Sequence, residues 1–173
     1  MVPEVLLRLS RVFPEFYHQD FCLKPKQVIC LEQLLNGNDV IAVLPTGFGK
    51  SLIFQLLPEL IPKKTSSNIV LVIAPLSSII KDQVNCLNSQ GKVSAGELNL
   101  CCSTDENDSL FSEEAVTVTQ LKVPKSIIDG QIQILFGHPE SFLCEEGRKI
   151  LKLDIYRNNV VACVIDEAHC VEM

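Results

Sequence analysis

The sequence predicts an α/β fold in which a parallel sheet is flanked by helices. Short runs of apolar, mostly β-branched residues alternate with segments of helical periodicity. The runs are apolar throughout, as in strands buried on both faces of a parallel sheet. The 173 residues suit one domain by length, and a hydrophobic content of 47% supplies enough apolar side chains for a core.

The expected elements alternate along the chain. A first helix is expected over residues 27–35, because its apolar residues share one face, and Asn36-Gly37 ends it. Four strands are expected at the continuous apolar runs 40–44, 69–74, 132–136 and 160–165. Between them, helices are expected over 50–60, 76–90 and 139–152. This alternation favours parallel strands joined by helical crossovers.

Residues 97–130 are expected to form an acidic loop insert within a single domain that spans 1–173. Six of the 21 acids lie between Glu97 and Glu114, where no base occurs, and the rest of the chain has 15 acids and 15 bases. A strand near 115–119 is a weaker expectation. Because the remainder is neutral, no broad basic surface indicates a nucleic-acid partner, and any such binding needs a few placed groups.

Several protein classes are excluded by composition. No apolar run reaches the roughly 18 residues of a membrane helix, because prolines interrupt the most apolar stretches. The N-terminus lacks the pattern of a secretory signal. The eight cysteines show no Cys-x-x-Cys spacing, so we expect free thiols used as small core residues in a reducing, intracellular compartment.

The strongest motif is Leu-Pro-Thr-Gly-Phe-Gly-Lys-Ser over residues 44–51, between an expected strand and an expected helix. Gly47 and Gly49 would let backbone N–H groups curl around an anion, which the N-terminus of the next helix also faces. Lys50 would reach the β- and γ-phosphates, and the Ser51 hydroxyl would ligate Mg²⁺. The strict pattern begins with glycine, whereas leucine ends the strand here. A chance glycine-rich turn is the alternative.

Two adjacent acids, Asp166 and Glu167, follow the fourth apolar run. Carboxylates at the end of a buried strand are costly unless they meet a cation, and ligands of open α/β sheets bind beyond such strand ends. Asp166 would hold Mg²⁺, mainly through water, and Glu167 would orient and deprotonate the attacking water. Alone, the pair could be a solvated turn. Together with the loop it indicates a P-loop nucleoside triphosphatase.

Five segments together resemble the motifs of RecQ-like DNA helicases of superfamily 2. Motifs 0, I, Ia, Ib and II are similar, in that order, to Leu23–Gln27, Pro45–Gln55, Ala74–Val84, Ile134–Phe142 and Asp166–Cys170. The resemblance covers nearly the whole chain. It implies a RecA-like ATP-binding lobe of a 3′–5′ DNA helicase, with ATP and Mg²⁺ as cofactors and DNA as partner. In a eukaryote it implies DNA repair or recombination in the nucleus.

The resemblance also implies roles for further residues. Gln27 would hydrogen-bond the adenine edge, and Thr46 would belong to the nucleotide-binding loop. Lys24 stands where the family usually has arginine, so guanidinium stacking on the base is lost. His169 would act in catalysis by coupling the nucleotide site to bound DNA. The single-strand backbone would be contacted from motifs Ia and Ib, by Ser77, Lys81 and His138.

Each of these roles has a plainer alternative. Gln27 could be a surface residue of its helix, and Ser77 could be part of an N-terminal helix cap. His138 could simply begin a turn before Pro139, and His169 could be structural. Phe48 stands where the family often has glycine, and we expect it to pack at the surface or against another domain, without a chemical role.

The resemblance finally implies parts that this sequence lacks. The family continues after motif II into an aromatic-rich loop, a strand with Ser-Ala-Thr and a second RecA-like domain with an arginine finger. We therefore expect a truncated domain with a gap in its sheet between strands 40–44 and 160–165, and no activity from the chain alone. Two functions stay open: the ATPase lobe of a helicase, or a truncated paralogue that binds nucleotide or a partner protein without helicase activity.

Overall fold

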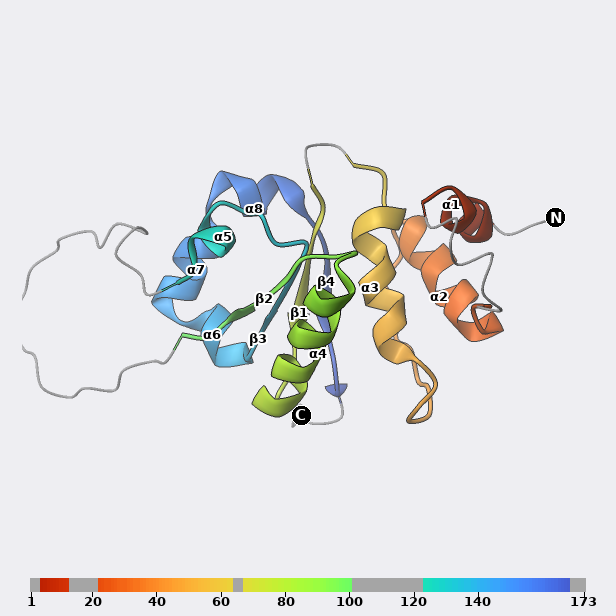
Figure 1. Ribbon diagram of the computed structural model, residues 1–173, viewed down its shortest axis with the longest axis horizontal. Coiled ribbons are helices and arrows are strands. Elements are labelled where there is room, and N and C mark those ends of the chain that lie inside the picture. The colour runs from red at the N-terminus through yellow and green to blue at the C-terminus, as the bar shows by residue number, and fades with distance from the viewer. Residues whose placement is uncertain (1–3, 13–21, 64–66, 101–122, 169–173) are drawn as a thin grey trace, which may run out of the picture. The chain divides into compact units, whose positions relative to one another are not determined.

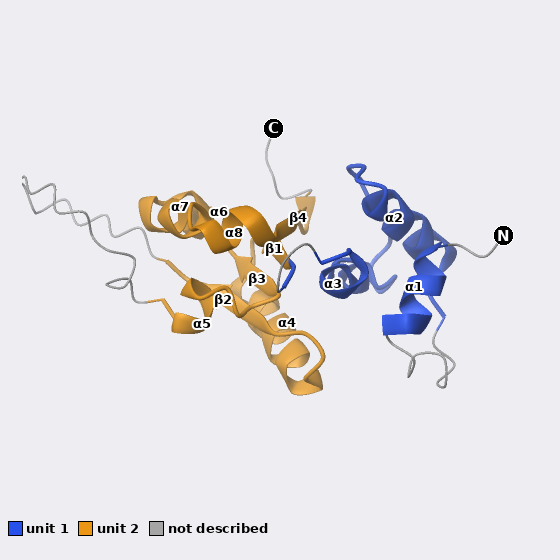
Figure 2. Ribbon diagram, turned by 90° about the horizontal axis from the view of Figure 1, so that it is seen from above, with its two compact units in different colours: residues 1–68 blue, residues 69–173 orange. Residues whose placement is uncertain are grey.

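The structure, a computed structural model, describes residues 4–12, 22–63, 67–100 and 123–168 (Figure 1). The chain divides into two compact units, residues 1–68 and 69–173 (Figure 2). Most of the acidic insert, including the expected strand near 115–119, lies outside the described residues. The prediction of a single domain with an insert over 97–130 therefore stays a prediction.

The second unit contains a four-stranded parallel sheet in the order β2-β3-β1-β4. The central strand β1 pairs with β3 on one side and β4 on the other, so that Leu71 lies opposite Leu135 and Cys163. The predicted class, a parallel sheet with flanking helices, is confirmed. The strands are β1 (Ile69–Ile73), β2 (Ala95–Leu98), β3 (Ile134–Gly137) and β4 (Val160–Ile165).

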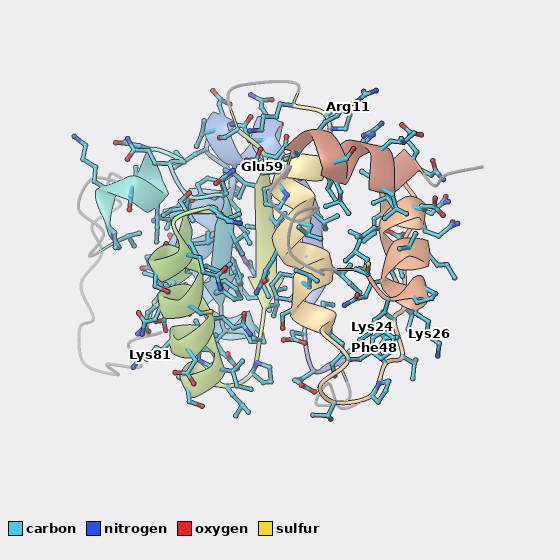
Figure 3. The ribbon with its side chains drawn as sticks, turned by 45° about the vertical axis from the view of Figure 1, so that its right-hand side comes forward. Arg11, Lys24, Lys26, Phe48, Glu59 and Lys81 are labelled. Carbon is cyan, nitrogen blue, oxygen red and sulfur yellow. The ribbon has the colours of Figure 1, made fainter. Side chains whose placement is uncertain are left out.

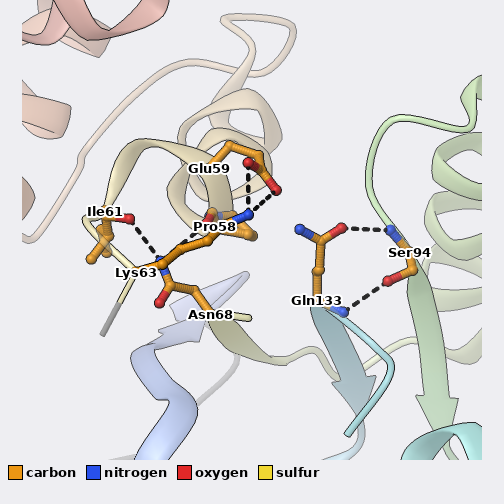
Figure 4. A network of polar contacts seen from close by, with 7 residues as sticks. All are labelled: Pro58, Glu59, Ile61, Lys63, Asn68, Ser94 and Gln133. Carbon is orange, nitrogen blue, oxygen red and sulfur yellow. Dashed lines mark hydrogen bonds and ion pairs between the residues drawn. The ribbon is translucent and has the colours of Figure 1, made fainter. Parts of the chain in front are cut away.

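Polar side chains fix the start of the β2–β3 pair. The Ser94 N–H donates to Gln133 Oε1 at 3.2 Å, and the Gln133 N–H donates to Ser94 Oγ at 3.1 Å (Figure 4). These reciprocal bonds lie one residue before each strand. They satisfy backbone groups at the point where the ladder begins, and so help to set its register.

Helices cover both faces of this sheet (Figure 2). Helix α4 lies on one face, and α6, α7 and α8 lie on the other. Ile69 and Leu71 of β1 belong to a buried cluster with Phe142, Ile150 and Tyr156 from these three helices. The helices are α4 (Ser77–Gln90), α5 (Lys125–Ile128), α6 (Pro139–Leu143), α7 (Glu145–Leu151) and α8 (Asp154–Asn159).

Tyr156 joins α8 to the short helix α5. Its hydroxyl donates a 2.6 Å hydrogen bond to the Ile127 carbonyl, and both residues are about 1% exposed. Burial raises the pKa of the Tyr156 phenol well above its ordinary value, so the donor stays protonated. The last part of the predicted insert, which contains α5, is thereby held by the helical layer.

Three helices lie in the described residues of the first unit. They are α1 (Glu4–Val12), α2 (Pro25–Leu35) and α3 (Lys50–Leu60). Val5, Leu31 and Leu57 are at most 1% exposed and belong to its core. The Arg8 guanidinium donates to the Leu60 carbonyl at 3.2 Å, which ties α1 to the end of α3. None of the helices in the described part of the chain has the length and apolar character needed to cross a membrane.

The prediction of a buried strand over 40–44 is wrong for this structure. The segment has no regular secondary structure and pairs with none of the described strands. Ile41 and Val43 are 95% and 86% exposed. An apolar run becomes a strand only where neighbours satisfy its backbone, and β1 takes its partners from β3 and β4. Within the described sheet β4 is an edge strand. The expected gap between 40–44 and 160–165 stays a prediction.

The predicted helix over 139–152 is two helices, separated at Cys144. Cys144 has extended backbone angles, and its Sγ accepts a 3.3 Å hydrogen bond from the Gly147 N–H, which caps α7. A Cβ at Gly147 would lie within 3.0 Å of the Phe142 carbonyl oxygen, so the two helices meet where only glycine fits. Four further elements, α1, β2, α5 and α8, were not predicted.

The thiols are less buried than the sequence suggested. Among the described free cysteines, Cys30 is buried, whereas Cys22, Cys86 and Cys163 are exposed. The interpretation as core residues therefore holds for Cys30. Burial raises the pKa of the Cys30 thiol, which favours its protonated form over the reactive thiolate.

Candidate nucleotide-binding site

The glycine-rich loop of the first unit runs directly into α3. The Phe48 N–H donates to the Pro45 carbonyl at 3.2 Å and closes a turn. Gly47 and Gly49 have φ values of 73° and 88°, in the left-handed region that side chains disfavour. Gly49 is the residue before α3, so Lys50 and Ser51 stand in the first helical turn. The predicted sequence of turn, glycines and helix N-terminus is present.

Two residues at the start of α2, Lys24 and Gln27, contact this loop. Figure 3 labels Lys24 and Phe48. The Gln27 amide donates to the carbonyls of Phe48 and Gly49, at 3.2 and 3.0 Å. The Lys24 ammonium donates to the same Phe48 carbonyl at 3.1 Å and lies 4.4 Å from the centre of the Phe48 ring. The backbone N–H of Lys24 donates to Gln27 Oε1 at 2.8 Å.

Gln27 is not a plain surface residue. It is 3% exposed, and its side chain makes three hydrogen bonds, which is the usual condition for burying an amide. A Cβ added at Gly49 would lie 2.7 Å from Gln27 Nε2, so a side chain there would displace the Gln27 amide. The role of Gln27 in reading adenine stays a prediction.

The loop suits a polyphosphate in its chemistry. Left-handed glycines before a helix present backbone N–H groups to an anion, and Lys50 and Ser51 add a cation and a hard oxygen ligand. Thr46 and Gly47 are exposed on the loop. Ser51 and Asp166 belong to different compact units, so their joint magnesium site stays a prediction.

In the second unit, Asp166 and Glu167 follow β4 directly. The Asp166 N–H donates to the Ile73 carbonyl at 2.9 Å and prolongs the ladder with β1. Asp166 Oδ1 accepts a 3.0 Å bond from the Glu167 N–H. Glu167 has a φ of 51°, a left-handed conformation that costs a non-glycine residue roughly 1–3 kcal/mol and is concentrated at functional sites.

The predicted nucleic-acid residues of motifs Ia and Ib are brought together. Ser77 follows β1 and His138 follows the neighbouring strand β3, and Ser77 Oγ lies 2.8 Å from His138 Nε2, within hydrogen-bond distance. The N-cap of α4 is Leu76, so Ser77 does not cap that helix, whereas His138 does begin α6 before Pro139. Lys81 is exposed one turn further along α4 (Figure 3).

Two further residues complete the list of site predictions. His169 lies outside the described residues, so its role stays a prediction. Phe48 was expected to pack without a chemical role, and its ring and carbonyl both contact Lys24. The sequence offered one signal for this pair, because each residue departs from the family pattern.

Known proteins are similar to this chain over most of its length. The family model described as DEAD/DEAH box helicase matches residues 24–173. The chain is 31% identical over 97% of its length to the ATP-dependent helicase SGS1 of Saccharomyces cerevisiae. It is 32% identical over 94% of its length to both the ATP-dependent DNA helicase RecQ of Haemophilus influenzae and the RecQ-like DNA helicase BLM of Xenopus laevis. The chain spans 10%, 22% and 11% of these three proteins.

Proposed function

Because the chain belongs to the DEAD/DEAH box helicase family, we propose that it forms the ATP-binding lobe of a RecQ-like 3′–5′ DNA helicase. The observation that carries this proposal is the phosphate loop, in which two left-handed glycines lead into a helix that begins with Lys50 and Ser51. The names of the relatives support ATP dependence and DNA as the substrate. A lobe acting on DNA would work in an intracellular, reducing compartment, the nucleus in a eukaryote.

The residues divide the chemistry between the two units. Lys50 and the loop amides would bind the β- and γ-phosphates, and Ser51 and Asp166 would ligate Mg²⁺. Glu167 would orient the attacking water and take its proton, with His169 coupling this step to bound DNA. A pure nucleotide binder has no need of Glu167, so a paralogue without activity is the less favoured function.

Binding of MgATP should depend on Lys50. We expect Lys50→Ala to lower the affinity roughly a hundredfold or more, because it removes a charge that faces two phosphates. Titration calorimetry would measure this, with Lys26→Ala as the control, since Lys26 is an exposed lysine of the same unit. Unchanged affinity of the Lys50 variant would refute the phosphate-loop assignment.

Hydrolysis should require a second RecA-like domain. The transition state for phosphoryl transfer needs a further cation, worth roughly 10³–10⁵ in rate in other P-loop enzymes, and no arginine of this chain lies in a motif that would place one. We expect negligible ATPase from residues 1–173 and DNA-stimulated turnover from a protein extended through that domain. Glu167→Gln should abolish the turnover while ATP still binds. Rapid hydrolysis by the 173-residue chain would overturn this two-lobe mechanism.

Single-stranded DNA should be contacted at the Ser77–His138 pair. Lys81→Met would remove one phosphate contact, so binding should weaken uniformly across sequences. The slope of log affinity against log salt should become shallower by about one. Fluorescence anisotropy of the helicase at several salt concentrations would measure both, and an unchanged slope would exclude Lys81 from the DNA interface.

A further inference from the structure

The contacts of Lys24 and Gln27 with the phosphate loop are all made to backbone carbonyls or to the Phe48 ring. Gln27 Nε2 has two N–H donors, and the Phe48 and Gly49 carbonyls accept from both. Lys24 supplies a second donor to the Phe48 carbonyl and a cation over its ring. Two successive peptide groups of the loop are therefore held from the side of α2.

Because the peptide group is planar, fixing the direction of a carbonyl also fixes the direction of the N–H that follows it. In a trans peptide the C=O and the following N–H point in opposite directions. Carbonyls of Phe48 and Gly49 that face α2 therefore turn the N–H groups of Gly49 and Lys50 to the opposite side of the loop. Backbone N–H groups on one side of such a loop are what bind an anion.

From this geometry we infer that Lys24 and Gln27 are positioning residues for the phosphate loop, which orient its N–H groups through the carbonyls of Phe48 and Gly49. The inference rests on the proposed nucleotide binding and deepens it. It differs from a contact with the base, because it acts on any bound polyphosphate. Phe48 takes part through its ring, which holds the Lys24 ammonium beside the carbonyl that it bonds.

A ligand without a base separates the two roles. The chain would be titrated with magnesium tripolyphosphate and, in parallel, with MgATP. Gln27→Met removes both donors without adding charge, and we expect about tenfold weaker binding of both ligands. Loss of affinity for MgATP alone, with tripolyphosphate unaffected, would overturn the inference and leave Gln27 as a base contact. Binding of neither ligand by the unmodified chain would refute the proposed function as well.

Lys24 provides a second test in which folding is not at risk, because its side chain is exposed. Lys24→Met should weaken tripolyphosphate binding about threefold to fivefold, and Lys24→Arg should restore it, since guanidinium keeps the donor and the stacking on Phe48. Lys26→Met removes the same charge two residues away and should have less than half that effect. Equal losses from Lys24→Met and Lys26→Met would mean that only net charge matters, and would overturn the positioning role of Lys24.

Discussion

Two apolar segments of this chain have nearly the same composition and opposite surroundings. Strand β1, Ile-Val-Leu-Val-Ile over 69–73, lies at the centre of the sheet, and its residues Ile69, Val70 and Val72 are fully buried. The segment Val-Ile-Ala-Val-Leu over 40–44 exposes Ile41 and Val43 almost completely. Each is followed by proline within two residues and then by a helix.

An apolar run forms a buried strand only where other strands and helices cover it, and its own sequence does not provide that cover. β1 has strands on both edges and helices on both faces, so its backbone is paired on both sides and its first four side chains are buried. No described strand pairs with 40–44. The same local preference therefore gives a core strand in one place and an exposed apolar segment in the other.

A charge placed in each segment should give the largest difference between the two in the free energy of unfolding. We expect Val72→Asp to lower the free energy of unfolding by roughly 4 kcal/mol or more, because it buries an unpaired carboxylate. Ile41→Asp should change it by less than about 0.5 kcal/mol, because that side chain is 95% exposed. Urea unfolding followed by circular dichroism would compare the two. Similar losses would mean that 40–44 is covered in solution.

Continuous apolar runs correctly predicted those strands of the sheet that other elements cover. The runs at 69–74, 132–136 and 160–165 each became a strand with bounds that shifted by two residues or fewer. β2 was not predicted, because its sequence Ala-Gly-Glu-Leu contains a glycine and an acid and is not a continuous apolar run. A Cβ at Gly96 would lie 3.2 Å from Ile132 Cδ1, a tight contact that would require Ile132 to shift slightly. Such a contact between distant residues leaves no periodic signal.

Replacing the asparagines that precede the two segments should give a smaller difference in the free energy of unfolding than the aspartate substitutions give. Asn68, 2% exposed, donates through Nδ2 to the carbonyls of Pro58 and Ile61, at 3.1 and 2.7 Å (Figure 4). Asn68→Ala would leave both acceptors without this donor, and we expect a loss of about 1–3 kcal/mol. Asn38 is exposed; its side chain donates to the Gln33 side chain, and its backbone N–H donates to the Gln33 carbonyl. Asn38→Ala should cost less than about 0.5 kcal/mol in the same unfolding assay, and an equal cost would show that local turn formation, rather than burial, sets both values.

The candidate site was predictable where a chemical role needs a fixed spacing. The glycines, Lys50 and Ser51 follow from how a loop and a helix N-terminus bind phosphate, and the structure has that backbone. The pairing of Ser77 with His138 needs strands β1 and β3 to be neighbours, which sequence order alone does not state. The contact between Lys24 and Phe48 joins two unusual residues across 24 positions, and only the fold brings them together.

Strand β4 is intermediate between the two segments, because it pairs with β1 along one edge and is exposed at Cys163. The reactivity of Cys163 should therefore differ only slightly between the folded and unfolded chain. Partial burial raises the pKa of the Cys163 thiol, so less thiolate is present at a given pH than in the unfolded chain. Alkylation of Cys163 at pH 8, followed by peptide mass spectrometry, should therefore be a few-fold slower in the folded chain than in urea. The difference should shrink as the pH rises through the folded pKa, because both states then become thiolate. Cys30, only 9% exposed, serves as the buried control and should react only on unfolding. If Cys163 were as protected as Cys30 at every pH, the edge of β4 would be covered in solution, and β4 would belong with β1 rather than between the two segments.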